Sequence, residues 1–250
     1  MQIERLAPQD LDLDTAEEVT CVFNAAHEAD GVDLPPRSGP SMLKYLQLQS
    51  DGTPVEGLWV ARSSEGRVVG GAILQLPRLE NTDSALLRGV VLPEVRRQGI
   101  GRALIDEALG PARDAERHKV YSGAFEGSPG GDALAATGFS SLGTTDAVRR
   151  IDLGVDSATR WQRLYDDASD RAGDYELLHL VGPTPPDLLD GLVGLHEAIN
   201  DAPLDDPDLE GDRWSADRVQ AYDRAMAGRS QTVYRVLARH RASGEWAGMS

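Results

Sequence analysis

The chain has 250 residues, enough for one large domain or two small ones, and its 40% hydrophobic and 26% charged content is typical of a soluble globular protein. Its net charge of −16 argues against a nucleic-acid partner, because a phosphate backbone would be repelled. No apolar run approaches the roughly 20 residues that cross a bilayer, and the first residues lack a signal-peptide pattern. We therefore expect no membrane partner and, by default, a cytoplasmic location.

The apolar spacing along the first 153 residues predicts alternating strands and helices. Predicted strands cover residues 2–6, 58–62, 68–76, 86–92 and 119–125, with a final pair between 139 and 153. Predicted helices cover residues 15–26, 40–48, 99–109 and 132–137, the first of them starting at the capping-box spacing of Thr15 and Glu18. Because residues 86–125 form a strand–helix–strand crossover, these two strands should be parallel.

The second half of the sequence resumes this pattern after a polar segment, residues 154–174, which predicts a connecting helix. Strands at 175–181 and 231–239 flank helices at 187–200 and 214–227. Val60-Ala61-Arg62 and Leu237-Ala238-Arg239 each precede a turn, about 177 residues apart, which indicates a structural repeat. The alternative is that two hairpins share short strings. A repeat would end before the strand and helix described next, with an unpaired edge strand near Trp246.

Residues 89–104 carry the clearest chemical signal. A strand ends at Pro93, a basic loop follows, and a helix opens at Gly99-Ile100-Gly101. The first amides of a helix have no internal partners, and together with the helix dipole they form an anion site. The stretch therefore predicts a pyrophosphate site. A phosphate-loop NTPase would need Lys-Ser or Lys-Thr, and a dinucleotide fold would need glycine at Leu104. The structural alternative is a plain strand-to-helix turn.

Arg96-x-x-Gly99-x-Gly101 after Val90-Val91-Leu92-Pro93 resembles the acyl-CoA signature of the GNAT superfamily of N-acyltransferases. Residues 132–139 are similar to that family's next helix with its Gly-Phe ending, and residues 175–250 resemble the first half of a second module, as in tandem GNAT proteins. The resemblance implies an α/β fold with a mixed, splayed β-sheet flanked by helices, followed by a partial second copy. We expect a GNAT-like domain at 1–153, a linker helix at 154–174, and a partial domain without the CoA motif at 175–250.

The resemblance also implies roles for individual residues. Acetyl-CoA would be the co-substrate, bound by Val90, Val91, Arg96, Arg97, Gln98, Gly99, Ile100, Gly101 and Arg102. The amides of residues 97–102 would hold the pyrophosphate, Val90 and Val91 would pair with the pantetheine arm, and the backbone near Val91 would polarise the thioester carbonyl. The implied reaction is acetyl transfer to a primary amine of a small molecule or peptide by direct attack.

A primary amine with a pKa of about 10.4 must lose a proton before it attacks, so the reaction needs a base. Glu80 and Asp83 precede the central strand, and Glu28 and Asp30 lie near the expected acceptor end. Glu80 is our first candidate for the catalytic base, and the alternative is a solvated surface acid. The acidic residues Asp201, Asp205, Asp206, Asp208, Glu210, Asp212 and Asp217 form either a solvated loop or a lip that attracts a cationic acceptor.

One departure from the family pattern concerns the leaving group. GNAT enzymes often have a tyrosine that protonates the thiolate, but the matching position here is Leu134, and the nearest tyrosine, Tyr121, lies on the preceding strand. This favours, as the alternative function, a non-catalytic acyl-CoA-binding or assembly module. Cys21 is the only cysteine and the histidines show no ligand spacing, so we expect no metal site. The edge near Trp246 is compatible with a homo-oligomer.

Overall fold

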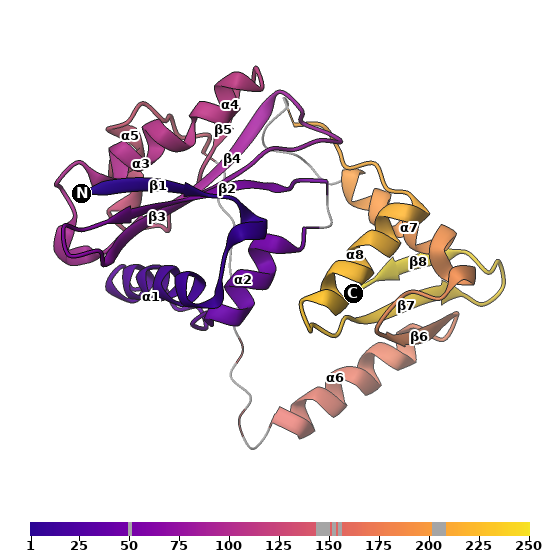
Figure 1. The fold of residues 1–250 in the computed structure, drawn as a ribbon. Helices are drawn as coiled ribbons and strands as arrows, with labels where there is room; N and C mark the ends of the chain where they lie inside the picture. The colour runs from indigo at the N-terminus through magenta and orange to yellow at the C-terminus, as the bar shows by residue number, and fades with distance from the viewer. Residues whose placement is uncertain (50–51, 144–150, 152–153, 155–156, 202–208) are drawn as a thin grey trace.

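A computed structural model of the chain describes residues 1–49, 52–143, 151, 154, 157–201 and 209–250. Within them it contains a five-stranded sheet of order β1-β2-β3-β4-β5 and a three-stranded sheet of order β6-β7-β8. Figure 1 shows the two sheets side by side, each with its own helices, and we call them the N-terminal and C-terminal modules. None of the helices described is long and apolar enough to span a bilayer.

The N-terminal module follows the predicted order of elements. Its strands are β1 Gln2–Leu6, β2 Val55–Arg62, β3 Val68–Gln75, β4 Ser84–Val91 and β5 Lys119–Tyr121. Its helices are α1 Leu13–Ala29, α2 Gly39–Gln47, α3 Ile100–Ala108, α4 Gly110–Asp114 and α5 Gly130–Ala135, with 3-10 turns at Pro8–Asp10 and Pro93–Val95. Strands β1 to β4 pair antiparallel, and β4 and β5 pair parallel. The predicted parallel crossover is thus confirmed.

The central strand, β3, is buried over its whole length because helices cover both faces of the sheet. A Cβ atom on Gly71 would contact Phe23 and Val19 of α1, whereas one on the next residue, Gly70, would meet Leu104 of α3. Successive residues of a strand point to opposite faces, so α1 and α3 lie on opposite sides of β3. Figure 1 shows α1 and α2 below the sheet and α3, α4 and α5 above it.

Several predicted boundaries in this module differ from the structure, such as the start of β2 at Val55 instead of residue 58, and two of them have a clear physical reason. Helix α1 starts at Leu13 rather than Thr15, because the Asp12 side chain accepts the Thr15 N–H at 2.8 Å and caps the helix earlier. Strand β5 ends at Tyr121 instead of residue 125. Pairing between β4 and β5 runs only from Ser84 to Leu86, while β4 continues to Val91. The two strands therefore separate beyond Leu86, and this is the splay that the family resemblance implies.

The C-terminal module repeats the first half of this arrangement. It contains α6 Ser157–Arg171, β6 Tyr175–Val181, α7 Leu189–Glu197, α8 Ala216–Gly228, β7 Tyr234–His240 and β8 Trp246–Met249, with 3-10 turns at Pro186–Leu188 and Ala198–Asp201. Two helices separate β6 from β7, as α1 and α2 separate β1 from β2. Even an ion pair recurs: Arg62 Nε lies 2.7 Å from Glu4 Oε1, and Arg239 Nε lies 2.6 Å from Glu176 Oε1. The expected second copy is confirmed.

Some predictions concern residues outside those described. The pair of strands expected between 139 and 153, and the boundary at 153, fall mostly on residues 144–150 and 152–153. Helix α6 lies inside the segment expected to be a linker helix, and β8, with Trp246, is an edge strand of the described sheet. The exact limits of the two domains stay a prediction.

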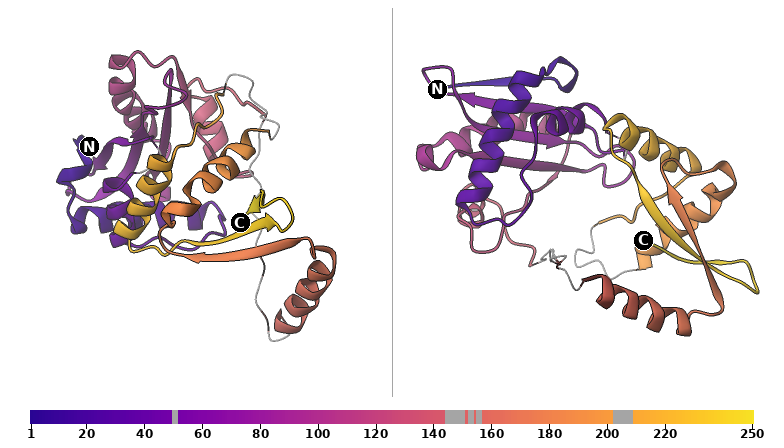
Figure 2. Two further views of the ribbon diagram at one scale, coloured as in Figure 1. Left: turned by 90° about the vertical axis from the view of Figure 1, so that its right-hand side faces the viewer. Right: turned by 90° about the horizontal axis from the view of Figure 1, so that it is seen from below.

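The two modules meet through polar contacts. Asn81 Nδ2 donates to the carbonyl of Glu210 at 3.2 Å, and the Glu210 N–H donates back to Asn81 Oδ1 at 2.9 Å. Near the end of α2, Lys44 Nζ donates to Ser230 Oγ at 2.5 Å. Figure 2 shows α8 on the side of the C-terminal module that faces the N-terminal module. The loop before β4 and the end of α2 are therefore the parts of the N-terminal module that contact the repeat.

Candidate functional site

The loop between β4 and α3 adopts a backbone that only a few residue types accept easily. Arg97 has φ of +64°, and Gly99, the residue before α3, has φ of +84° and ψ of −4°. Glycine takes this left-handed conformation without steric cost, which explains why the sequence has glycine there. No side chain among the described residues caps α3. The first amides of this helix are thus without a side-chain partner, as an anion site requires.

The start of α3 lies against the end of β4. A Cβ atom on Gly101 would be 3.6 Å from Val91 Cγ2, at ordinary contact distance. Ile100 is buried in the main apolar core and anchors the start of the helix. Arg97, Gln98 and Gly99 are exposed beside it. The predicted site residues therefore divide into a buried anchor and an exposed stretch of backbone with positive charge.

Arg96 has a second role that its place in the motif did not reveal. Its guanidinium donates to the two carboxylate oxygens of Asp30 at 2.6 and 3.1 Å, and its Nε donates to the Val91 carbonyl at 3.0 Å. These bonds tie the end of β4 to the end of α1. Asp30, one of the acids considered as a base, is therefore the partner of Arg96.

The register of β4 determines which backbone groups face the splay. The Leu92 N–H donates to Val69 of the neighbouring segment at 2.9 Å. Because alternate residues of an antiparallel strand point their N–H and C=O groups to opposite sides, Val90 directs its backbone toward β3, whereas Gly89 and Val91 direct theirs toward β5. Sequence reasoning missed Gly89, although the alternation along the strand could have indicated it. The roles of Val90 and Val91 in binding stay predictions.

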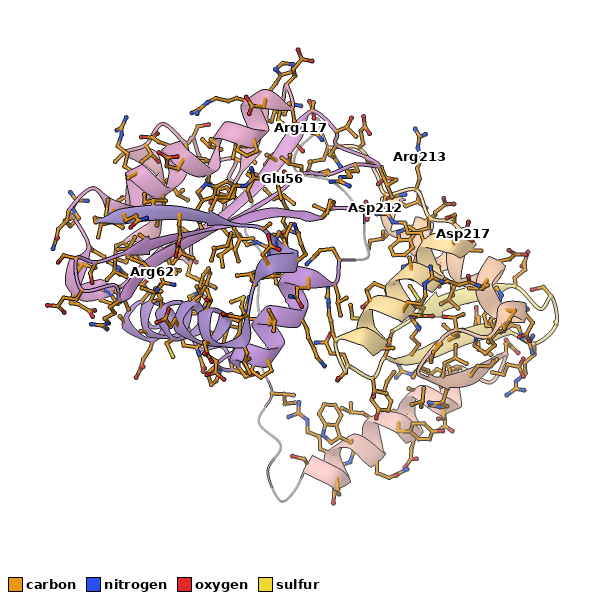
Figure 3. All side chains as sticks on the ribbon, in the orientation of Figure 1. Glu56, Arg62, Arg117, Asp212, Arg213 and Asp217 are labelled. Carbon is orange, nitrogen blue, oxygen red and sulfur yellow. The ribbon has the colours of Figure 1, made fainter. Side chains whose placement is uncertain are left out.

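Glu80 is not a solvated surface acid. Its side chain is buried, and both carboxylate oxygens lie 3.0 Å from Nη1 of Arg218, a residue of α8 in the other module. The Arg213 N–H donates to Glu80 Oε1 at 2.9 Å. Figure 3 shows Asp212 and Arg213 on the segment of the C-terminal module nearest the N-terminal module. Glu80 thus joins the two modules, and its role as a base stays a prediction.

A cavity of about 300 Å³ lies at this junction. We call it the acidic cavity, and its lining residues are Gly52, Thr53, Pro77, Leu79, Glu80, Asn81, Ser84, Leu86, Tyr121, Leu209, Asp212 and Arg218. Ser84, Leu86 and Tyr121 belong to the paired ends of β4 and β5, so the cavity lies where the splay closes. Of the acidic stretch considered from the sequence, Asp212 reaches this cavity, and residues 202–208 lie outside the described residues.

The remaining candidates lie elsewhere. Asp83 pairs with Lys119 at 3.2 Å, and Glu28 is exposed on α1. Leu134, at the position of the family's tyrosine, is half-buried on α5. Burial, followed by the charge of Arg37, lowers the pKa of His27, so its imidazole is neutral at neutral pH. Among the described residues that line the acidic cavity, the carboxylates are thus those of Glu80 and Asp212.

The fold and this loop define the class of protein. Residues 23–139 match the family model described as the acetyltransferase (GNAT) family. The matched residues include the β4–α3 loop, so this part of the chain is similar to that family. The search of curated proteins gave no match.

Solved structures extend the likeness to the second module. A tandem GNAT protein from the clavulanic acid biosynthesis pathway is 23% identical, with a TM-score of 0.66, over 99% of this chain and 73% of its own. The chain as a whole thus has a tandem GNAT fold. An aminoglycoside acetyltransferase from an uncultured soil metagenomic sample is 21% identical over 62% of this chain and 95% of its own, with a TM-score of 0.43. A ribosomal-protein-alanine N-acetyltransferase from Brucella melitensis biovar Abortus 2308 is 22% identical over 60% of this chain and all of its own, with a TM-score of 0.42.

Proposed function

We propose that this protein is an N-acyltransferase that moves the acetyl group of acetyl-CoA to a primary amine. The observation that carries the proposal is the uncapped start of α3, with Gly99 in the left-handed conformation, beside the stretch of β4 that runs on past its pairing with β5. Amides at a helix start bind phosphate groups, and an unpaired strand edge can pair with an amide-bearing chain. Acetyl-CoA contains both phosphate groups and an amide-bearing arm, and it supplies an activated acetyl thioester.

Each residue of the loop would have a separate task. The amides of residues 97–102 would hold the pyrophosphate, and the exposed Arg97 would add positive charge beside it. The backbone of Val91 and Gly89 would pair with the arm, while Val90 would contact it through its side chain. Arg96 and Ile100 would keep the loop in place through the Asp30 ion pair and the core. These residues fit the group chemically, because they leave the backbone accessible where phosphate oxygens need donors.

The acidic cavity would receive the acceptor. From Val91 to Leu86, β4 takes five residue-to-residue steps, about 17 Å, and at Leu86 the splay closes beside this cavity. The amine nitrogen would form a bond to the acetyl carbon, the carbon–sulfur bond would break, and the proton lost by the amine would finally reside on the thiol. Glu80 lines the cavity and is our candidate for the group that takes this proton, directly or through one water molecule.

Leu134 supports a second candidate function. An aliphatic side chain cannot donate a proton to a thiolate, so a module that binds acyl-CoA without transferring the acyl group is the alternative. A thiol with a pKa near 8.5 leaves without an acid at a tolerable rate, which is why we favour the enzyme. A cytoplasmic location and self-association stay predictions.

The test has two arms. Calorimetry with CoA measures binding, and thiol release from acetyl-CoA measures turnover across a panel of primary amines, with an amine-free reaction as the blank. We expect binding together with thiol release that depends on at least one amine. CoA at 100 times its dissociation constant should also raise the unfolding free energy by about 2.7 kcal/mol. Binding without release would support the non-catalytic module, and no heat with CoA would contradict both functions.

A further inference from the structure

A second cavity, of about 270 Å³, lies between α2, β4 and α8. It adjoins the acidic cavity, since Thr53 and Leu86 line both. Two guanidinium groups line it, Arg88 from β4 and Arg229 from the end of α8, and we call it the arginine cavity. The two modules thus each contribute one arginine to the same cavity.

Tyr45 of α2 holds the two arginines together. Its hydroxyl accepts a hydrogen bond from Arg88 Nη1 at 3.2 Å and donates to Gln75 Oε1 at 3.3 Å. The guanidinium of Arg229 lies over the Tyr45 ring, 5.4 Å from its centroid, and its Nε donates to the Leu48 carbonyl at 2.8 Å. Both arginines are therefore oriented by neutral partners, and each keeps further N–H donors than these bonds use.

The charge around this cavity is unusual for the chain. Acidic residues outnumber basic ones by 41 to 25, and the buried or half-buried Arg96, Arg218 and Arg235 pair with carboxylates. Among the described residues that line the arginine cavity there is no aspartate or glutamate. Two guanidiniums without a carboxylate between them repel each other, and an anion between them would remove this cost. Planar guanidiniums match carboxylate oxygens in geometry.

The arginine cavity also lies beside the proposed reaction position. Gly71 faces α1 and pairs across the sheet with Val90, so Val90 points to the face that carries α1 and α2. Arg88 and Leu86 lie on this same face, and Arg88 follows Leu86, which lines both cavities, by two residues or about 7 Å along the strand. An anion between Arg88 and Arg229 would therefore lie within the length of a small molecule from an amine at the splay.

From this geometry we infer that the arginine cavity binds a carboxylate of the acceptor, so that the acceptor is an amine that also carries a carboxylate, as amino acids do. The identification of the bound carboxylate as part of the acceptor rests on the proposed acyl transfer. Binding of a carboxylate in this cavity can be tested without turnover. The inference predicts recognition through both modules: Arg88 from the N-terminal module and Arg229 from the repeat.

The first experiment measures binding alone. The probe is N-acetylphenylalanine, which has a carboxylate and no free amine, and its matched control ligand is N-acetylphenylalanine amide. Calorimetry should detect the acid, with at least tenfold weaker affinity for the amide. Arg88→Gln and Arg229→Gln should each weaken binding of the acid at least tenfold. Arg224→Gln is the matched protein control, because it removes one positive charge from an exposed position of α8 that does not line the cavity.

The second experiment measures turnover with acetyl-CoA. Phenylalanine and γ-aminobutyrate are compared with their primary amides, and the wild-type protein should prefer the carboxylate form at least tenfold in kcat/KM. In Arg88→Gln the KM for the acids should rise while kcat changes less than twofold, because the carboxylate is bound equally in ground and transition states.

The outcomes separate the two proposals. Arginine-dependent binding of N-acetylphenylalanine without any thiol release would support the carboxylate subsite and contradict the proposed acyl transfer. Thiol release with equal preference for acids and amides, or equal affinity of wild type and Arg88→Gln for the probe, would overturn the subsite. Arg229 also joins the modules, so the unfolding midpoint is measured for each variant. If Arg229→Gln is unstable, the result for Arg88→Gln decides, because Arg88 is exposed.

Discussion

The two modules share the same first three strands and helix pair but are stabilised in different ways. In the N-terminal module β3 is buried on both faces, and a continuous apolar core extends from α1 to α4. In the C-terminal module β6 alternates between exposed and half-buried residues, and the core cluster of its described residues has four buried apolar side chains: Leu189, Leu192, Val219 and Leu237. A single fold can therefore be held by a large apolar core or by a small one with added polar bonds.

The added polar bonds in the C-terminal module centre on a buried ion pair. Asp223 of α8 accepts hydrogen bonds from Arg235 Nη2 at 2.7 Å and from the Thr184 N–H at 2.7 Å. Both charged side chains are about 5% exposed. The comparison teaches that the copy with the β4–α3 loop resembles an independent domain, whereas the described part of the other copy depends on charge pairs, both inside it and toward its neighbour.

The largest expected effect on ligand binding separates the two copies by function. Gly99→Val forces a β-branched residue into φ of +84°, which should displace the α3 amides and weaken CoA binding at least tenfold. Gly182→Val is the matched control, because Gly182 has the same φ of +84° and equally open surroundings in the C-terminal module. Calorimetry and chemical denaturation check both. Each variant should lose about 1–2 kcal/mol of stability, and only Gly99→Val should lose affinity.

Equal CoA affinity in the two glycine variants would refute the assignment of the site to the β4–α3 loop. Loss of affinity in Gly182→Val as well would show that CoA binding depends on the C-terminal module, and the functional contrast between the copies would fail.

The next effect concerns the link between the modules. Arg218→Met leaves the Glu80 carboxylate buried without its charged partner, and we expect a loss of about 3–5 kcal/mol of unfolding free energy. Adding Glu80→Gln should restore much of it, because the uncompensated charge is then gone. Arg67→Met is the control: it breaks the pair of Arg67 with Glu94, whose side chains are 66% and 54% exposed, and should cost less than about 1 kcal/mol.

Urea denaturation of these variants, read separately for the two modules, measures the link. If Arg218→Met were no less stable than Arg67→Met, Glu80 would not serve to join the modules. The single variant Glu80→Gln also tests the proposed base: a fall in kcat for amine acetylation with unchanged CoA affinity supports the catalytic role, and an unchanged kcat excludes it.

The smallest expected effect is on the pH dependence of stability, and it is tested by comparing one aspartate from each module. Burial alone would raise the pKa of Asp223, but hydrogen bonds from Thr184 and Arg235 outweigh it and hold this pKa below the ordinary value of 3.8. Hydrogen bonds from Thr15 lower the pKa of Asp12, a fully exposed cap of α1. A lowered carboxyl pKa gives stability that is complete above the ordinary value and is lost as the pH falls through the folded-state value.

We therefore expect stability to fall in acid below about pH 4, with a larger share from Asp223 because solvent screens Asp12. The measurement is the slope of unfolding free energy against pH for wild type, Asp223→Asn and Asp12→Asn, rather than the absolute stability. Asp223→Asn should flatten the slope more than Asp12→Asn. The opposite order would mean that the buried pair does not distinguish the C-terminal module.

The sequence by itself determined the local features of this protein. Apolar spacing predicted most strands and helices, and the glycine-containing stretch after Pro93 predicted the start of a helix at residues 99–101, because such preferences act over a few neighbouring residues. The similar strings that end at Arg62 and Arg239 indicated the repeat. The ion pairs of these arginines with Glu4 and Glu176 recur in the two modules and support it.

Only the tertiary structure decided which distant residues meet. Asp30 with Arg96, Glu80 with Arg218, and Arg88 with Arg229 are pairs brought together by sheet order and by the docking of the modules. The early end of β5 at Tyr121 has the same origin, since a strand ends where its neighbour diverges and not where its own residues stop favouring extension. Side-chain charge and spacing carry no information on such meetings until packing has fixed the distances.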